Sequence, residues 1–190
     1  MLAIFKREFK SYFQNVIGWL FVAALLAVYG LYFYVYNLKN GYPYISYDLK
    51  GIGFIMMIAV PILTMRSLSD EKKTKTDQLM LTSPVSVGRI VAGKYFAMAA
   101  VYTIDIALFA LSPLVLSIYG KVALSEAYVA LFGYWLYGLS CIAVGLFISS
   151  ISESVIISAI LTFAALFLSY MMQSITGLIS SSGNMLTKVL

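Results

Sequence analysis

Five long apolar runs constrain the fold of this chain more than any other feature of its sequence. They lie roughly at residues 16–36, 47–65, 95–118, 127–150 and 155–175. A helix of about 20 residues is about 30 Å long, which is enough to cross the hydrocarbon core of a bilayer. Only helices and closed barrels satisfy their backbone in lipid, and continuous runs without alternating polar residues are typical of helices. The sequence therefore predicts an all-α integral membrane protein with five transmembrane helices.

The composition agrees with a membrane environment and argues against several classes of function. Of the 190 residues, 62% are hydrophobic and 11% are charged, whereas a soluble domain is about 45–50% apolar and about 25% charged. The chain has one cysteine, Cys141, and no histidine. It therefore lacks an intrachain disulfide framework as well as the commonest metal ligand and general base. The net charge of +5 is only a weak signal for nucleic acid here, and we expect no nucleic-acid partner.

The distribution of Lys and Arg predicts the orientation of the chain. With the N-terminus inside, the cytoplasmic segments hold nine of these residues and the outer segments hold four. The excess of positive charge on cytoplasmic loops favours this arrangement. The first apolar run is too long for a signal-peptide core and lacks a clear cleavage site, so we expect it to remain as an anchor. Residues 66–94 then form the main cytoplasmic loop.

Residues 1–15 have the pattern of a helix that lies in the membrane interface. Their apolar residues recur every three or four positions, with the basic residues largely on the other face. A basic amphipathic helix next to a span is expected to lie in the headgroup plane and to contact anionic lipid. The alternative is a simple positively charged flank, which would not need the periodic aromatic residues.

A dense cluster of charge opens the long loop. Six charged residues lie from Asp70 to Asp77, and Ser69 and Asp70 are both good helix N-cap types. We expect a polar helix that begins at Ser69 or Asp70 and reaches Leu81, a break at Thr82-Ser83-Pro84, and a second short helical stretch over 85–94. A passive connector could be much shorter, so we expect this loop to contact a partner.

Several polar or small residues fall inside the apolar runs. Asp48 and Lys50 are expected to push the start of the second span inward, and Pro61 and Pro113 to kink their spans. Asp105 lies midway along the third span, where an ionised carboxylate is costly. It is either protonated and hydrogen-bonded in a structural role or faces a polar pathway. Two stripes of small residues predict close helix packing, namely Gly138, Cys141, Gly145 and Ser149 on the fourth span and Ser158, Thr162, Ala165 and Ser169 on the fifth.

Residues 65–97 read MRSLSDEKKTKTDQLMLTSPVSVGRIVAGKYFA. This segment resembles the one that follows the second span in type-2 ABC transporter permeases, in which charged residues and a Thr precede a Leu-rich stretch, Thr-Ser-Pro-Val and a Gly-Lys. GLFISSISES at 145–154 resembles the cytoplasmic end of the family's fourth span, and FKREFKSYF at 5–13 resembles its interfacial helix. The chain is most similar to the gliding-motility-type permeases that work with an auxiliary subunit.

The resemblance implies a permease subunit of an ATP-driven exporter in a plasma (inner) membrane of bacterial type. The chain has no Walker-type loop, because GKYFAM lacks the upstream glycine and the hydroxyl. ATP and Mg²⁺ would therefore belong to separate cytoplasmic ABC ATPase subunits, with no cofactor in this chain. A second permease copy or a paralogue, and an auxiliary extracytoplasmic subunit, are further implied partners. The residues expected to couple to the ATPase are Asp70, Glu71, Lys72, Lys73, Thr76, Leu79, Leu81, Pro84 and Glu153.

The sequence departs from the family pattern in two places. Lys75 stands where the family often has Gly, and Gln78 where it often has Glu. The family also usually has a sixth span, whereas residues 176–190 are neither long nor apolar enough to cross a membrane. We expect the sixth span to be truncated here or supplied by another chain. A membrane scaffold or accessory subunit that transports nothing is the alternative function, and an intramembrane enzyme is disfavoured because paired carboxylates and histidines are missing.

Overall fold

The computed structural model describes the backbone of residues 2–42, 44–75, 86–119 and 123–189, and the side chains of these residues except 119 and 173–189. Within these ranges the chain is all-helical, as predicted. The elements are α1 (Leu2–Gln14), α2 (Val16–Phe33), the π-helical η1 (Tyr34–Lys39), α3 (Ile45–Thr64), α4 (Ser69–Lys73), α6 (Val87–Phe109), α7 (Ser112–Tyr119), α8 (Leu124–Ile151) and α9 (Val155–Val189).

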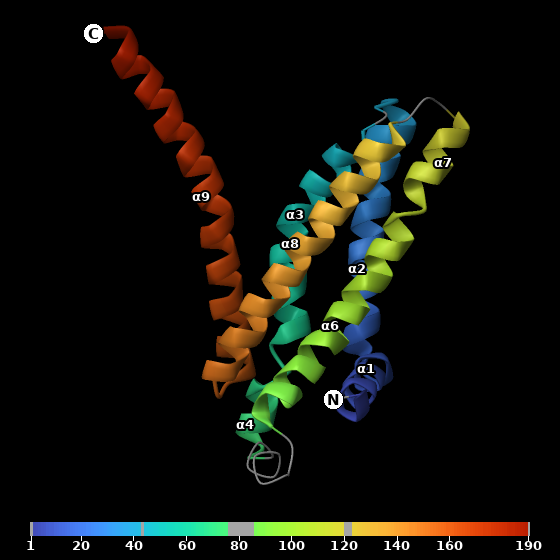
Figure 1. Ribbon diagram of the computed structural model, residues 1–190, viewed down its shortest axis with the longest axis vertical. Helices are drawn as coiled ribbons and strands as arrows, with labels where there is room; N and C mark the ends of the chain where they lie inside the picture. Colours follow the sequence, from blue (N-terminus) through green and yellow to red (C-terminus); the bar gives the residue numbers. More distant parts are fainter. Residues whose placement is uncertain (1, 43, 76–85, 120–122, 190) are drawn as a thin grey trace.

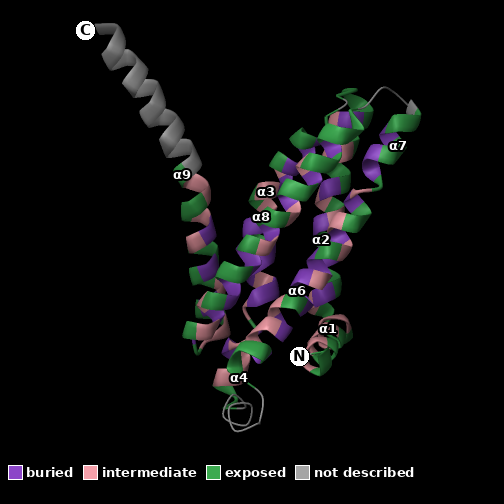
Figure 2. Ribbon diagram, in the orientation of Figure 1, coloured by how far each residue is buried: buried purple, intermediate pink, exposed green. Residues whose placement is uncertain are grey.

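Five stretches of the described chain are long and apolar enough to cross a membrane, which confirms the predicted number of spans. They are Val16–Lys39, Ile45–Lys73, Val87–Ile118, Leu124–Ile151 and Val155–Met172. Four of them, which contain α2, α3, α6 and α8, pack into one bundle around a continuous core of buried apolar side chains (Figures 1 and 2). The fifth, α9, contacts α3 and α8 near its start and then leans away from the bundle (Figure 1).

The two ends of the bundle differ in the elements that close them. α1 and α4 lie at one end, and α7 and the turn after η1 lie at the other (Figure 1). α1 is the amphipathic helix predicted for residues 1–15, and it packs across the start of α6. Gly93 permits this approach, because a Cβ at that position would lie 3.0 Å from Ile4 Cγ2. The loop predicted to be cytoplasmic therefore starts beside the predicted interfacial helix.

The small residues of α8 form a packing face, as predicted. A Cβ added at Gly138 would lie 2.3 Å from the ring of Tyr102 on α6, and one added at Gly145 would lie 2.5 Å from Thr64 Oγ1 on α3. Such overlaps are sterically impossible, so α6 and α3 can approach α8 this closely only where it carries glycine. The Tyr102 hydroxyl also donates to the Tyr134 carbonyl at 2.8 Å. These contacts place α8 at the centre of the bundle.

Several boundaries differ from those expected from sequence. α3 begins at Ile45 rather than inward of Lys50, because Asp48 is buried against the Asn37 side chain of η1, which donates to its carboxylate. The stretch 87–94 is not a separate short helix but the first turns of α6. The kink expected at Pro113 corresponds to an interruption at residues 110–111 between α6 and α7, whereas Pro61 lies inside the uninterrupted α3. α9 continues as one helix beyond the predicted end at residue 175.

Candidate functional site

The structure places the residues expected to couple to an ATPase around α4. Asp70, Glu71, Lys72 and Lys73 form most of this short helix, which packs against the ends of α8 and α9. Glu153 lies close by in the turn between α8 and α9, with its side chain exposed. The remaining expected residues lie outside the described residues, namely Thr76, Leu79, Leu81 and Pro84. The described part of the loop expected at 69–86 is therefore Ser69–Lys75 and Ser86.

A buried lysine joins α4 to two other elements. Lys94, from the second turn of α6, is 2% exposed. Its Nζ lies 2.7 Å from Glu71 Oε1 on α4, 2.9 Å from the Ser67 carbonyl oxygen and 3.4 Å from Glu8 Oε1 on α1. The ammonium has three donors, and three acceptors from three segments surround it. We call Glu8, Ser67, Glu71 and Lys94 the Lys94 cluster.

The charges around the Lys94 cluster make it close to neutral. Two carboxylates and one ammonium meet there, and Arg7 supplies a second positive charge at 2.8 Å from Glu8 and 3.9 Å from Glu71. Breaking one partner of a buried ion pair strands the others, so such a group holds its members together more strongly than an exposed pair. The cluster therefore fixes α1, α4 and the start of α6 relative to one another.

A serine from α8 caps the start of α4. The Ser149 hydroxyl accepts from the backbone N–H groups of Leu68 at 3.1 Å and Ser69 at 3.2 Å, and Ser69 Oγ donates to the Ser149 carbonyl at 3.0 Å. Free N–H groups at a helix start need such acceptors. The expectation that Ser69 or Asp70 caps this helix with its own side chain is wrong, because Leu68 is the N-cap residue and makes no side-chain cap bond. The cap comes from another span instead.

α4 ends sooner than the sequence predicted. The helix stops at Lys73, and Lys75 adopts a left-handed conformation with φ 56°. The Lys75 N–H donates to the Lys72 carbonyl at 3.1 Å, as in a helix end that turns through a left-handed residue. Glycine is the favoured residue in this conformation, and the resembling family often has Gly at this position. The helix expected to reach Leu81 is therefore interrupted by residue 75.

The side chains of α4 point in two directions. Glu71 faces the Lys94 cluster and Lys72 donates to the Ser150 carbonyl of α8, so both are turned toward the bundle. Asp70 keeps 43% of its side-chain surface exposed beside Arg66, and Lys73 is exposed. The charge available to a partner in the described part of the loop is thus on Asp70, Lys73 and the exposed Lys75 rather than on Glu71.

A polar cavity of about 570 Å³ separates α1 from α4, and its walls include Arg7, Arg66 and Asp70. Tyr12 also borders it, and its hydroxyl donates to the Leu63 carbonyl at 3.4 Å. Burial, together with the Glu8 charge, raises the pKa of this tyrosine. The hydroxyl therefore stays protonated and remains a donor at neutral pH.

Asp105 lies on the same helix as Lys94 but in a different environment. Its side chain is fully buried, and neither carboxylate oxygen has a hydrogen-bond partner among the described residues. The hydrogen-bonded structural role expected as one alternative is therefore absent from the described part of the chain. No group of three His, Cys, Asp or Glu side chains that could hold a metal ion occurs there either.

Reasoning from sequence missed Glu8, Lys94 and Ser149 as site residues. A signal existed for two of them, since Lys94 belongs to the Gly-Lys pair of the resembling segment and Ser149 ends the small-residue stripe of the fourth span. Their partners are 23 and 80 positions away in sequence. That pairing becomes visible only once the helices are placed.

The comparison with known families agrees with this architecture. The model of a family described as ABC-2 family transporter protein matches residues 5–189, nearly the whole chain. The chain belongs to the ABC-2 transporter family. It is a multi-pass membrane protein and a permease, the transport subunit of an ABC transporter rather than its ATPase. No curated protein and no solved structure matches it.

Proposed function

We propose that this ABC-2 permease is the membrane subunit of an exporter and that residues 69–86 dock on a separate cytoplasmic ATPase. The observation that carries the proposal is the way in which α4 is fastened. The Lys94 cluster fixes it to α1 and α6, and Ser149 and Ser150 fix it to α8. A displacement of α4 would therefore be transmitted directly to α1, α6 and α8 through these hydrogen bonds and ion pairs.

This arrangement suits a device that transmits motion between subunits. Packed elements in fixed register shift as rigid bodies, and such shifts carry conformational change between domains. In the proposed complex, ATP and Mg²⁺ bind the ATPase, and its closure displaces α4 together with α1, α6 and α8. The end that carries α1 and α4 faces the cytoplasm of a bacterial-type cell, and the chain resides in its plasma membrane.

The exposed charges of α4 supply the proposed contact. Asp70 and Lys73 point away from the bundle, and Glu153 lies in the adjacent turn. Charges at the rim of an interface set partner choice and register more than affinity. Thr76, Leu79, Leu81 and Pro84 belong to the same proposed contact surface. A second permease copy or a paralogue completes the transport pathway, Asp105 contributes a polar group to it, and an auxiliary extracytoplasmic subunit assists.

Site-specific photo-crosslinking in cells tests the docking surface. A photoreactive phenylalanine at Lys73 of the full-length chain is expected to capture a protein with Walker motifs, identified by mass spectrometry. The same residue at Lys39, exposed at the opposite end of α2–η1, is the matched control and should not capture it. Capture of the ATPase from Lys39 instead, or from neither position in a complex that contains the ATPase, would overturn the proposal. An ATPase that crosslinks at Lys73 without any transport would favour the scaffold alternative.

A further inference from the structure

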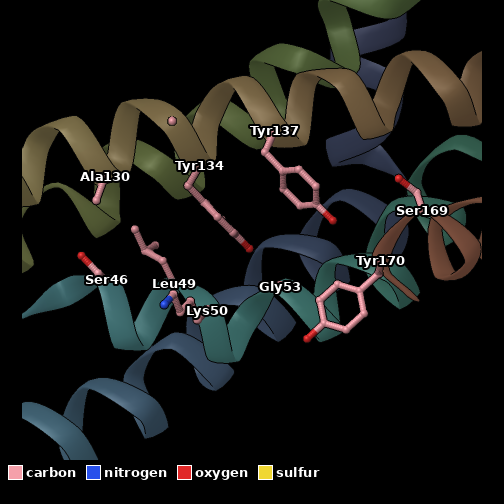
Figure 3. A pocket seen from close by; sticks show the side chains of 10 residues that line it. Ser46, Leu49, Lys50, Gly53, Ala130, Tyr134, Tyr137, Ser169 and Tyr170 are labelled. Atoms are coloured by element: carbon pink, nitrogen blue, oxygen red, sulfur yellow. The ribbon is translucent and has the colours of Figure 1, made fainter. Parts of the chain in front are cut away.

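A second cavity lies away from α4, where α9 leans away from the bundle. It has a volume of about 610 Å³ and is bordered by α3, α8 and α9. Figure 3 shows Tyr134 and Tyr137 reaching from α8 toward α3, with Ser46 and Lys50 on α3 and Tyr170 on α9. Its volume is in the range of cavities that hold small ligands.

The described side chains that line this cavity carry positive charge and hydroxyl groups but no negative charge. The described residues that border it include one ammonium, on Lys50, and five hydroxyl-bearing side chains, Ser46, Tyr134, Tyr137, Ser169 and Tyr170, and no carboxylate. In the described part of the chain no Asp or Glu forms an ion pair with Lys50. The neighbouring Asp48 accepts a hydrogen bond from the Asn37 side chain on the other side of α3. The cavity therefore offers donors to an anion and lacks the charge that would repel one.

Two further observations indicate that the cavity is incomplete without an occupant. The Tyr134 hydroxyl is buried and has no hydrogen-bond partner among the described residues, although such a group normally has one. Gly53 and Gly133 border the cavity with open space where a Cβ would stand. The helices do not close on these glycines, in contrast to Gly138 and Gly145 in the packed core.

The depth of Lys50 narrows the class of ligand. It lies five residues after the start of α3, or about 8 Å along the helix axis. Lys50 is exposed and lies near one end of a helix that is long enough to span a hydrocarbon core, so its side chain can extend to the level of the lipid headgroups. An anionic headgroup at that level would neutralise it, and α9 leaves the cavity open toward the acyl chains.

We propose that this cavity binds an anionic phospholipid from the leaflet opposite α4, with its phosphate on Lys50 and its chains along α3, α8 and α9. The phosphate oxygens accept from the ammonium and from hydroxyl groups of the cavity wall. The site is independent of ATPase docking, so either proposal can fail alone.

Native mass spectrometry of the purified full-length chain, titrated with phosphatidylglycerol and with phosphatidylcholine, tests this site. We expect tighter binding of the first phosphatidylglycerol, and a loss of about tenfold in its affinity in Lys50→Gln, since this change removes a hydrogen bond between two charged groups. Gly53→Leu fills the cavity and should weaken binding similarly. Lys39→Gln and Gly30→Leu are matched controls at exposed positions, Gly30 having open space around it, and should bind as the unmodified chain does.

Three results would overturn the inference. Equal affinity for the two lipids, or equal losses in Lys50→Gln and Lys39→Gln, would show that attraction to the surface alone is being measured. Full competition by glycerol 3-phosphate at the lipid's own affinity would show that the acyl chains do not contribute. A purified dimer in which Gly53→Cys crosslinks to its counterpart would place a second copy of the chain in the cavity.

Discussion

Lys94 and Asp105 lie on one helix, eleven positions apart, and both are buried, yet the protein treats the two charges differently. The Lys94 ammonium has three acceptors from three segments. The Asp105 carboxylate has no hydrogen-bond partner in the described part of the chain. A buried charged group with partners holds together the elements that provide them, whereas a buried carboxyl group without partners links no elements. The comparison assigns Lys94 a structural role and gives Asp105 no such role among the described residues.

Replacing Lys94 should have the largest effect on stability. Lys94→Met removes the buried cation that Glu8 and Glu71 share and leaves them only the exposed Arg7. We expect a loss of about 3 kcal/mol, at the lower end for broken buried pairs, because these carboxylates are still 14% and 18% exposed. Thermal unfolding of the purified chain measures it. Lys73→Met, at an exposed lysine of α4, is the control, and an equal loss in both variants would contradict the assignment.

Removing the cap of α4 should have the next largest effect. Ser149→Ala deletes the acceptor for two backbone N–H groups, a change that costs about 1–2 kcal/mol at a helix start. Ser150→Ala is a close control, since the exposed Ser150 hydroxyl only donates to the Phe147 carbonyl of its own helix. Hydrogen exchange of the Leu68 and Ser69 amides should accelerate in the first variant and not in the second. Unchanged exchange in Ser149→Ala would mean that the Ser149 hydroxyl does not stabilise the start of α4.

Glycine at position 75 should stabilise the C-terminal end of α4. Lys75 pays a penalty of about 1 kcal/mol for its left-handed conformation, so Lys75→Gly should raise stability by up to this amount while Lys75→Ala should not. Chemical denaturation of the two variants side by side measures the difference. Equal stability of Lys75→Gly and Lys75→Ala would show that residue 75 does not adopt the left-handed conformation in the purified protein.

Asp105 should give the smallest change in stability and so sharpens the contrast with Lys94. Because its carboxylate makes no hydrogen bond in the described chain, Asp105→Asn removes no contact and should change the free energy of unfolding by under about 0.5 kcal/mol or raise it. We expect transport by the complete complex to fall while abundance is unchanged. Loss of both together would return Asp105 to a structural role.

The sequence predicted the parts of this fold that follow from local pattern. Each of the five spans, the amphipathic α1 and the packing face of α8 depends on the residues of its own segment. All of these features agree with the structure. The start of α3 depends instead on a contact between two segments. α3 starts earlier than expected because Asn37, from another element, satisfies Asp48.

The candidate site was less accessible to such reasoning than the fold. Glu71 could be singled out as an acidic residue early in a charged helix, but its direction depends on Lys94, 23 positions later. The sequence likewise offered Ser69 as its own cap, whereas the acceptor comes from Ser149. Charged side chains pair according to tertiary neighbours, and no periodicity encodes that choice.

The most direct test of the central claim, that the Lys94 cluster carries motion from α4 into the bundle, is a distance measurement in the complete complex with its ATPase. Spin labels at Asn40→Cys and Ser125→Cys report on the end opposite α4, in a Cys141→Ala background. With the natural Glu71 we expect the label distance to shift between the nucleotide-free and vanadate-trapped states. Glu71→Gln breaks the ion pair to Lys94 and should abolish that shift while the ATPase stays bound and hydrolyses ATP. An unaltered shift in Glu71→Gln would contradict the account, as would loss of the ATPase itself, which would place Glu71 at the docking surface instead.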